Sequence, residues 1–290
     1  MNTIEVKDLR KHFGSTKAVD GISFDVRQGE IFGFLGPNGA GKTTTIRCLM
    51  DFIRPTSGSI QLLGQDSQAN SVELKHRIGY LSGYVRLYDK WTGWDHIRFF
   101  KKFNGRTDSS AELIKRLDFD PTRKAGQLSS GNKQKLGILL AMMHDPELLI
   151  LDEPTIGLDP LLQNEIYKLL RERIQKGMTV FFSSHNLPEV EKICTRVGII
   201  RQGKMVAVQS IDELKEKKVY RIHAHTPSGF DRSQFNLPNV SFLESPANEL
   251  SLEVRGEVSE IVRALGKYQL SDLSIERAPL EQIFLEYYEQ

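Results

Sequence analysis

The sequence predicts an α/β fold, and three features support that prediction. Two short apolar runs, at residues 148–151 and 178–183, have the length and composition of strands buried on both faces. A third run, at residues 31–35, leads into a glycine-rich stretch, and residues 43–50 then have the apolar spacing of a helix. A strand, a loop and a helix in this order are typical of the units from which α/β domains are built.

The glycine-rich stretch fits the phosphate-loop pattern G-x-x-x-x-G-K-T/S with the residues Gly36, Pro37, Asn38, Gly39, Ala40, Gly41, Lys42 and Thr43. Its glycines let the backbone curl so that successive N–H groups point at an anion, and the helix dipole adds positive potential. Lys42 can reach the β- and γ-phosphates of a nucleotide, Thr43 can offer its hydroxyl to Mg2+, and Thr44 can donate to the α-phosphate. An ordinary glycine-rich turn is disfavoured because the stretch lies between a strand and a helix.

A small β layer is expected before this loop. Residues 3–9 and 22–26 alternate apolar and polar side chains, as half-buried antiparallel strands do, and residues 14–16 and 28–29 are typical of turns. Phe13 lies at the tip of this layer, where its ring can stack on a base or belong to the core. After the loop helix we expect a strand at 59–63, a short helix at 72–76 and a strand at 78–81.

Two adjacent carboxyl groups follow the apolar run at 148–151. Since ligands in α/β sheets lie at the carboxyl ends of the strands, Asp152 can hold Mg2+, directly or through water. Glu153 can orient and deprotonate an attacking water molecule. His185 stands just beyond the strand at 178–183, and we expect it to hydrogen-bond a γ-phosphate.

A helical insert is expected at about residues 84–145. We predict helices at 93–104, with Thr92 as the cap and Asp95 at the positive end, at 111–117 and at 133–143. Aromatic residues concentrate between residues 84 and 103, and we expect most of their rings to form a helical core, with some lining a docking groove. They are Tyr84, Tyr88, Trp91, Trp94, Phe99, Phe100 and Phe103.

The rest of the chain predicts two domains, which comprise residues 1–218 and 219–290. A helix at 161–176 and a hairpin at 197–208 complete the first domain, which ends with a helix at 211–217. A small α/β appendage follows, with strands near 219–225, 240–244, 250–254 and 273–277 and helices at 258–268 and 280–288. Neither a phosphate loop nor another nucleotide motif occurs in the appendage.

Composition excludes several classes of protein. The formal net charge is +2 and no Lys/Arg block is present, so nucleic acid is not expected as a partner. No window has the roughly 18 to 20 consecutive apolar residues that span a bilayer, and the N-terminus lacks the apolar core of a signal peptide. We therefore expect the chain to stay in the cytoplasm. Cys48 and Cys194 are too few for a disulfide framework or a metal site, and we expect both to be buried.

With these features in place, the run Leu128-Ser129-Ser130-Gly131-Asn132 resembles the LSGGQ signature of ABC ATPases. The resemblance covers residues 4 to about 215 and implies a RecA-like P-loop core that binds ATP and Mg2+. It also implies a Walker A loop at Gly36–Thr44, a Walker B strand ending at Asp152 and Glu153, a D-loop ending at Asp159, a switch histidine at His185 and an adenine-stacking Phe13. The chain is similar to ATPase subunits of bacterial drug- and peptide-efflux transporters, whose C-terminal extensions are also comparable.

The resemblance further implies a head-to-tail pair of ATPase domains, as a homodimer or a heterodimer. Ser129, the backbone N–H of Gly131, and Asp159 would act in trans, on ATP held by Lys42 of the second domain. The helical insert would carry the resulting movement to a transmembrane permease. This places the chain on the inner face of the cell membrane, in contact with the membrane only through the permease.

One departure from the family pattern bears on catalysis. Where the family has a Q-loop glutamine, after residues 78–82, this sequence has Gly83, which has no side chain to ligate Mg2+. We predict that water takes that coordination position and that hydrolysis by the isolated protein is slow. The departure keeps a nucleotide sensor with little turnover as an alternative. Soluble non-transport ABC ATPases are a second alternative, disfavoured because this chain has neither a second ATPase domain nor heptads at residues 44–127. A GTPase is disfavoured because no N-K-x-D motif occurs.

Overall fold

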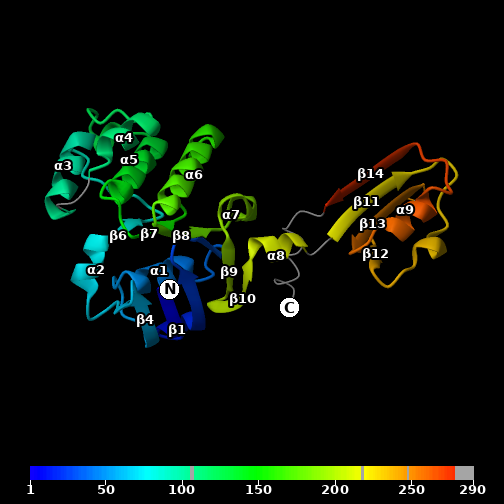
Figure 1. Ribbon diagram of the computed structural model, residues 1–290, viewed down its shortest axis with the longest axis horizontal. Coiled ribbons are helices and arrows are strands. Elements are labelled where there is room, and N and C mark those ends of the chain that lie inside the picture. Colours follow the sequence, from blue (N-terminus) through cyan, green and yellow to red (C-terminus); the bar gives the residue numbers. More distant parts are fainter. Residues whose placement is uncertain (105–107, 217–218, 247, 278–290) are drawn as a thin grey trace. The chain divides into compact units, whose positions relative to one another are not determined.

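The computed structural model describes residues 1–104, 108–216, 219–246 and 248–277 (Figure 1). The chain divides into two compact units, Met1–Gln209 and Ser210–Gln290. The boundary predicted between residues 218 and 219 remains a prediction, because residues 217 and 218 lie outside the described residues. No helix of the described part of the chain is both long and apolar enough to cross a membrane.

The first unit contains an antiparallel sheet of four strands in the order β2-β1-β4-β5. These strands are β1 (Asn2–Phe13), β2 (Thr16–Arg27), β4 (Ser57–Leu62) and β5 (Gln65–Asp66). β1 pairs antiparallel with both β2 and β4, which confirms the predicted β layer and extends its strands. Alternate side chains such as Ile4, Val6 and Phe24 turn into the core.

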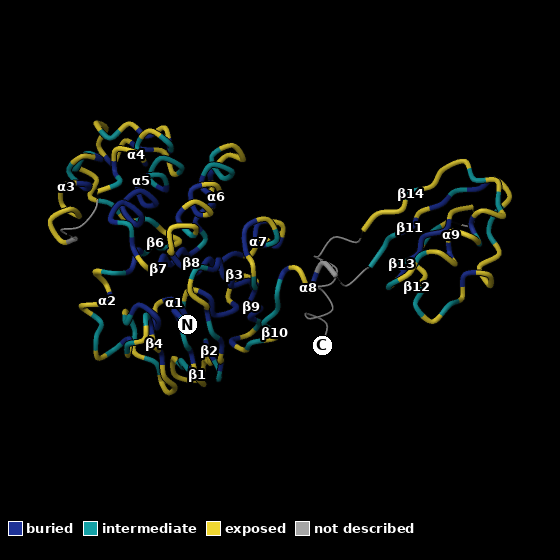
Figure 2. The backbone as a smooth tube through the Cα atoms, viewed as in Figure 1, coloured by how far each residue is buried: buried dark blue, intermediate teal, exposed yellow. Residues whose placement is uncertain are grey.

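A second sheet of six strands has the order β10-β9-β3-β8-β7-β6. Its strands are β3 (Ile31–Leu35), β6 (Ile78–Leu81), β7 (Leu148–Asp152), β8 (Thr179–Ser184), β9 (Arg196–Arg201) and β10 (Lys204–Ser210). The strands from β9 to β6 run parallel. Every residue of β3, β7 and β8 is buried, which explains why these segments are continuous apolar runs (Figure 2). The carboxyl ends of β3, β7 and β8 therefore meet at one edge of the sheet.

The two sheets share one hydrophobic core with α1 (Lys42–Leu49), the helix that follows the phosphate loop. Phe24 of the first sheet packs against Phe32, Phe34 and Phe181 of the second, with ring centroids 5.4–5.9 Å apart. Cys48 belongs to this core and, like Cys194, is buried, as predicted. The core fixes where α1 begins relative to the edge of the six-stranded sheet.

The remaining helices of the first unit are α2 (Ser71–Arg77), α3 (Gly93–Asn104), α4 (Ser110–Arg116), α5 (Ser130–Met142), α6 (Pro160–Gln175) and α7 (Leu187–Ile193), with a 3-10 turn at Ala125–Gln127. α3, α4 and α5 form the predicted helical insert and lie together in Figure 1. Thr92 accepts a hydrogen bond from the N–H of Asp95, and Asp95 accepts one from the N–H of Thr92, so the predicted cap is confirmed. Hydrogen bonds from Thr92 and Arg98 hold the pKa of Asp95 at about 2. The sequence did not predict α7.

The second unit has its own core. α8 (Ile211–Glu216) precedes a four-stranded antiparallel sheet in the order β12-β13-β11-β14, which packs against α9 (Ser259–Leu265) and a 3-10 turn at Arg232–Phe235. The strands are β11 (Val219–His225), β12 (Val240–Phe242), β13 (Glu249–Arg255) and β14 (Asp272–Arg277). The predicted elements from 219 to 277 are thus present, and the helix expected at 280–288 lies outside the described residues.

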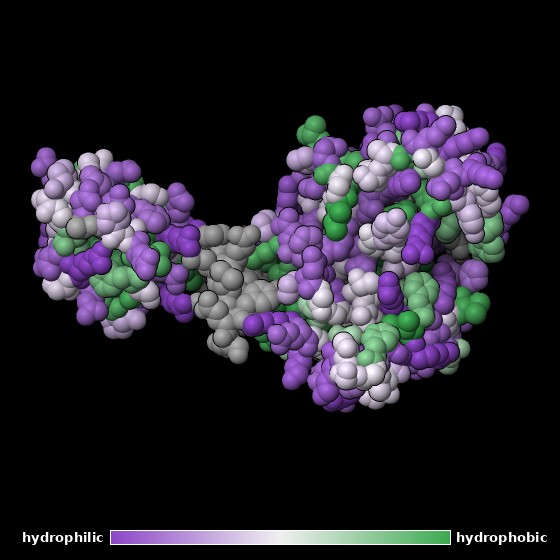
Figure 3. All heavy atoms as spheres, turned by 180° about the vertical axis from the view of Figure 1, so that it is seen from behind, coloured by the Kyte–Doolittle hydropathy of each residue, from purple (hydrophilic) through white to green (hydrophobic). Residues whose placement is uncertain are grey.

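Hydrophilic side chains cover most of the visible face of both units, with hydrophobic ones scattered among them (Figure 3). Scattered apolar residues are ordinary on the surface of a folded domain. A gathering of aromatic side chains in the first unit is different, because they line a common groove.

Candidate functional site

The phosphate loop joins the end of β3 to the start of α1. Gly41 has φ +112°, and a Cβ at Gly36 would lie 2.3 Å from the carbonyl oxygen of Ile200, so neither position accepts a side chain. The loop surrounds a cavity of about 200 Å3. Its lining residues are Ala18, Pro37, Asn38, Gly39, Gly41, Lys42, Thr43, Thr44 and Glu153. Of the residues predicted from Gly36 to Thr44, all except Gly36 and Ala40 therefore line one cavity at the N-terminus of a helix.

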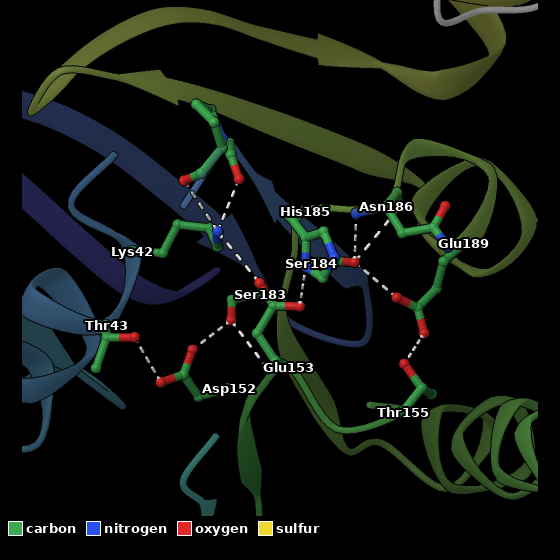
Figure 4. A network of polar contacts seen from close by, with 12 residues as sticks. Lys42, Thr43, Asp152, Glu153, Thr155, Ser183, Ser184, His185, Asn186 and Glu189 are labelled. Carbon is green, nitrogen blue, oxygen red and sulfur yellow. Dashed lines mark hydrogen bonds and ion pairs between the residues drawn. The ribbon is translucent and has the colours of Figure 1, made fainter. Parts of the chain in front are cut away.

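Lys42 is the cation of this cavity, and it is buried with 6% of its surface exposed. Its Nζ donates to the carbonyl oxygens of Gly36 and Pro37 at 2.7 and 3.3 Å and lies 3.2 Å from Oε1 of Glu153. The second carboxyl oxygen of Glu153 lies 2.8 Å from Nδ1 of His185 (Figure 4). Lys42, Glu153 and His185 thus form a continuous polar chain along the edge where β3, β7 and β8 end.

A second polar pair lies beside the chain from Lys42 to His185. The hydroxyl of Thr43 donates to Oδ2 of Asp152 at 2.8 Å, and the hydroxyl of Ser183 donates to Oδ1 at 2.7 Å. The Oγ atom of Ser183 also accepts the N–H of Glu153 at 3.2 Å. Ser183 therefore orients both carboxyl residues. The sequence did not predict this role of Ser183, because it depends on the pairing of β7 with β8.

Burial and the Asp152 carboxylate raise the pKa of the neighbouring Tyr80 to about 12.

These residues fit a nucleotide phosphate with a divalent cation. The buried ammonium group of Lys42, at the N-terminus of α1, suits phosphate oxygens because it places positive charge beside the cavity. The hydroxyl of Thr43 and the carboxylate of Asp152 are oxygen ligands of the kind that Mg2+ prefers, and they already lie within hydrogen-bonding distance of each other. Asp152 is only 2% exposed, so a cation there would compensate a buried carboxylate.

Phe13 lies at the end of β1 and is 51% exposed, with Nζ of Lys11 4.9 Å from its ring centroid. It is not part of the core, which leaves its ring free to stack on a ligand. The structure does not place it in the wall of the loop cavity, where Ala18 of β2 lies instead.

The signature residues lie at the start of α5 and beside the loop that leads into α6. Ser129 caps α5 by accepting the N–H of Asn132, and Asp159 caps α6 by accepting the N–H groups of Leu161 and Leu162. A Cβ at Gly131 would lie 3.3 Å from the carbonyl oxygen of Gly157, so the two caps belong to one surface. Ser129 and Asp159 are both exposed, and their side chains do not take part in the contacts around Lys42.

Gly83 follows β6 and faces the Asp152 carboxylate. A Cβ at this position would lie 3.4 Å from the carbonyl oxygen of Asp152 and 3.5 Å from its Oδ2, which is ordinary van der Waals contact. A side chain would therefore fit and would point at the candidate cation site.

The aromatic residues of the insert are more exposed than the sequence predicted. Six of the seven rings between residues 84 and 103 are exposed, so the expectation that most of them form a core is wrong. α3 turns Ile97 and His96 inward, and the rings on its other faces remain at the surface. Several line a groove of about 500 Å3 between the insert and the core of the first unit, together with Phe52 and Tyr80. Those from the insert are Tyr88, Phe99, Phe100 and Phe103.

The fold and the site together define a P-loop nucleotide-binding protein, with a phosphate loop, an acidic strand end and a histidine around one cavity. The family model described as ABC transporter matches residues 19–156. The bacitracin transport ATP-binding protein BcrA of Bacillus licheniformis is 41% identical over 220 residues, which are 74% of this chain and 72% of that protein. The chain therefore belongs to the ABC transporter family and is an ATP-binding protein and an ATPase of that family.

Two further comparisons agree with this assignment. The uncharacterised ABC transporter ATP-binding protein YhcH of Bacillus subtilis is 32% identical over 98% of this chain and 95% of its own length, so the similarity includes the second unit. A solved ATP-binding subunit of an ABC transporter aligns with a TM-score of 0.69 and 28% identity, over 74% of this chain and 92% of that one. The family and the P-loop α/β fold predicted from the motifs are thus confirmed.

Proposed function

We propose that the chain is the ATP-hydrolysing subunit of an ABC exporter and works in the cytoplasm, at the inner face of the cell membrane. The observation that carries this proposal is the contact chain from Lys42 through Glu153 to His185, beside the pair of Thr43 and Asp152. Transport is supported by similarity to a protein named for bacitracin transport, and export by similarity to a protein named for Nod factor export. Phosphate release from ATP, with and without Mg2+, tests the proposal, and a nucleotide sensor would bind ATP without releasing phosphate.

The site residues would act on ATP as follows. The loop amides and Lys42 would bind the β- and γ-phosphates, Thr44 would donate to the α-phosphate, and Phe13 would stack on the adenine. Mg2+, held by Thr43 and Asp152, would neutralise charge on the phosphate oxygens. Glu153 would accept a proton from the water that attacks the γ-phosphorus while the bond to the β-phosphate oxygen breaks.

His185 would hydrogen-bond the γ-phosphate from the side opposite Lys42. In the described state its Nδ1 lies 2.8 Å from Glu153, and Lys42 lies 3.2 Å from the same carboxyl group. Both side chains would therefore exchange contacts with Glu153 for contacts with phosphate when ATP binds. This exchange leaves the Glu153 carboxylate available to the attacking water.

Two copies, or this chain and a related ATPase, would complete each site. Ser129, the N–H of Gly131, and Asp159 share an exposed surface, and none of them contacts Lys42 of its own chain. The N-terminus of α5 carries positive potential, which suits a γ-phosphate bound by a second chain. ATP would then hold the pair together, and loss of the γ-phosphate would release it.

The aromatic groove would receive the permease. Its walls come from the helical insert and from the core, so a segment seated in it would sense movement between the two. Aromatic side chains are enriched at protein interfaces, where they bury large area at small entropic cost. An apolar cytoplasmic segment of a transmembrane subunit fits this chemistry.

Phe103→Asp tests the groove. Placing a charge among the rings is expected to reduce stimulation of ATP hydrolysis by the co-expressed permease about tenfold, because an unpaired carboxylate would be desolvated on docking. Val72→Asp is the matched control, since Val72 is 76% exposed and does not line the groove. Equal stimulation of Phe103→Asp and Val72→Asp would place the permease elsewhere.

Gly83→Gln tests the altered Q-loop position. The amide oxygen would reach toward the cation site beside Asp152, and we expect kcat for Mg2+-dependent hydrolysis to rise about threefold or more. Gly83→Ala adds the Cβ without the ligand and should leave kcat near that of the original protein. An unchanged rate and unchanged Mg2+ dependence in Gly83→Gln would show that the missing side chain does not limit hydrolysis.

A further inference from the structure

Glu189, on α7, takes no part in the site described above, yet it is buried, with 8% of its surface exposed. Its carboxyl group accepts three side-chain hydrogen bonds. Oε1 accepts from the hydroxyls of Thr155 and of Tyr167, the latter at 2.9 Å, and Oε2 accepts from Ser184 at 2.6 Å. A buried acid with this many donors is costly to assemble, which points to a role in holding the segments that carry the donors.

Two of the three donors lie next to the candidate catalytic pair in the sequence. Thr155 lies two residues after Glu153, and Ser184 lies immediately before His185. The Oγ atom of Ser184 also accepts the N–H of Asn186 at 2.9 Å, so it fixes the backbone on both sides of the histidine (Figure 4). One carboxyl group therefore links the loop after β7 to the loop after β8.

The loop after β7 needs such support. Glu153 has φ +49°, in the left-handed region that a residue with a Cβ seldom adopts unless its surroundings hold it there. On the N-terminal side its N–H is held by Ser183 of β8. On the C-terminal side Thr155 is anchored to Glu189, so both sides of the strained residue are tied to the segment that carries His185.

We propose that Glu189 is a positioning residue for ATP hydrolysis, which holds the loops of Glu153 and His185 in register so that both side chains face the γ-phosphate. The proposal rests on the roles proposed above for Glu153 and His185. This role gives α7 a function beyond packing. α7 begins two residues after His185, and the carboxyl group of Glu189 on this helix binds both loops.

Tyr167 supplies a matched control within the same cluster. Its hydroxyl donates to Oε1 of Glu189 from α6, and Tyr167 adjoins neither of the two loops in sequence. Burial and the Glu189 carboxyl group raise the pKa of Tyr167 well above its usual range, so the hydroxyl remains a donor. Tyr167→Phe thus removes one hydrogen bond from the same acceptor without releasing either loop.

The test compares Thr155→Val, Ser184→Ala and Tyr167→Phe in the full chain by steady-state and single-turnover hydrolysis of ATP. Thr155→Val and Ser184→Ala are expected to lower kcat about tenfold with KM for ATP changed by less than about twofold, because geometry and not ATP binding is lost. Tyr167→Phe should keep kcat within about twofold of the original protein. Thr155→Ser, which keeps a hydroxyl at this position, should keep the kcat that Thr155→Val loses. The double variant Thr155→Val/Ser184→Ala should lose little more than either single variant, since both break the same link.

Two results would overturn the proposal. One is a kcat for Thr155→Val and Ser184→Ala equal to that of Tyr167→Phe. The other is a loss of kcat that follows the fall in melting temperature across all the variants, Tyr167→Phe and Thr155→Ser included. Glu153→Gln separates this failure from failure of the proposed function. If Glu153→Gln is inactive while Thr155→Val and Ser184→Ala hydrolyse ATP at the normal rate, only the positioning role of Glu189 is wrong. Normal hydrolysis by Glu153→Gln would refute the role of Glu153 itself.

Discussion

Glu153→Gln is expected to lower kcat for ATP hydrolysis by about 10^3-fold, which is within the range that a positioned general base contributes. The amide keeps the size of the side chain and can still contact His185 and Lys42, but it cannot accept a proton from water. ATP affinity should therefore change little. Phosphate release under single-turnover conditions measures the loss, and titration with a fluorescent ATP analogue measures the affinity.

Glu147→Gln is the control for this substitution. Glu147 precedes β7 and forms an ion pair with Arg77 at 2.7 Å, away from the loop cavity. Its replacement should leave kcat unchanged. Hydrolysis by Glu153→Gln at the original rate would mean that another group activates the water.

Lys42→Ala is expected to weaken binding of Mg2+-ATP by about 100-fold or more, because it removes the one side-chain cation among the residues that line the loop cavity. It also leaves Glu153 without the ammonium group 3.2 Å away. Isothermal titration calorimetry with Mg2+-ATP gives the affinity directly. Lys204→Ala, at an exposed position of β10, is the control and should bind as the original protein does. An affinity for Lys42→Ala close to that of Lys204→Ala would contradict the account of the loop.

The sequence predicted the part of the site that rests on local pattern. The phosphate loop needs glycine at fixed positions because Gly41 has φ +112° and Gly36 lies against the backbone of Ile200. These requirements appear in the sequence as glycines at a fixed spacing. Asp152 and Glu153 could be found because two acids at the end of a fully buried strand are seldom structural. The cap formed by Thr92 and Asp95 is likewise a contact between neighbours in sequence.

What the sequence did not predict depends on contacts between distant segments. Ser183 acts on Asp152 because β7 and β8 are adjacent, and Glu189 gathers donors from positions 155, 167 and 184. A serine at a strand end and a glutamate in a short helix have no pattern that marks them. The exposure of the aromatic rings in the helical insert was not predicted for a related reason. Helical periodicity predicts which face of a helix is buried, but it does not show whether other elements cover the remaining faces.

We propose that one chain provides only part of a catalytic site, which a second ATPase domain completes around ATP. The most direct test is size-exclusion chromatography with light scattering on Glu153→Gln, with and without ATP, because this variant should bind ATP without hydrolysing it. We predict a monomer without nucleotide and a dimer with ATP, and we predict that adding Ser129→Arg abolishes the dimer while ATP still binds. A protein that stays monomeric with ATP bound, or a dimer that persists with Ser129→Arg, would contradict head-to-tail closure by two copies of this chain.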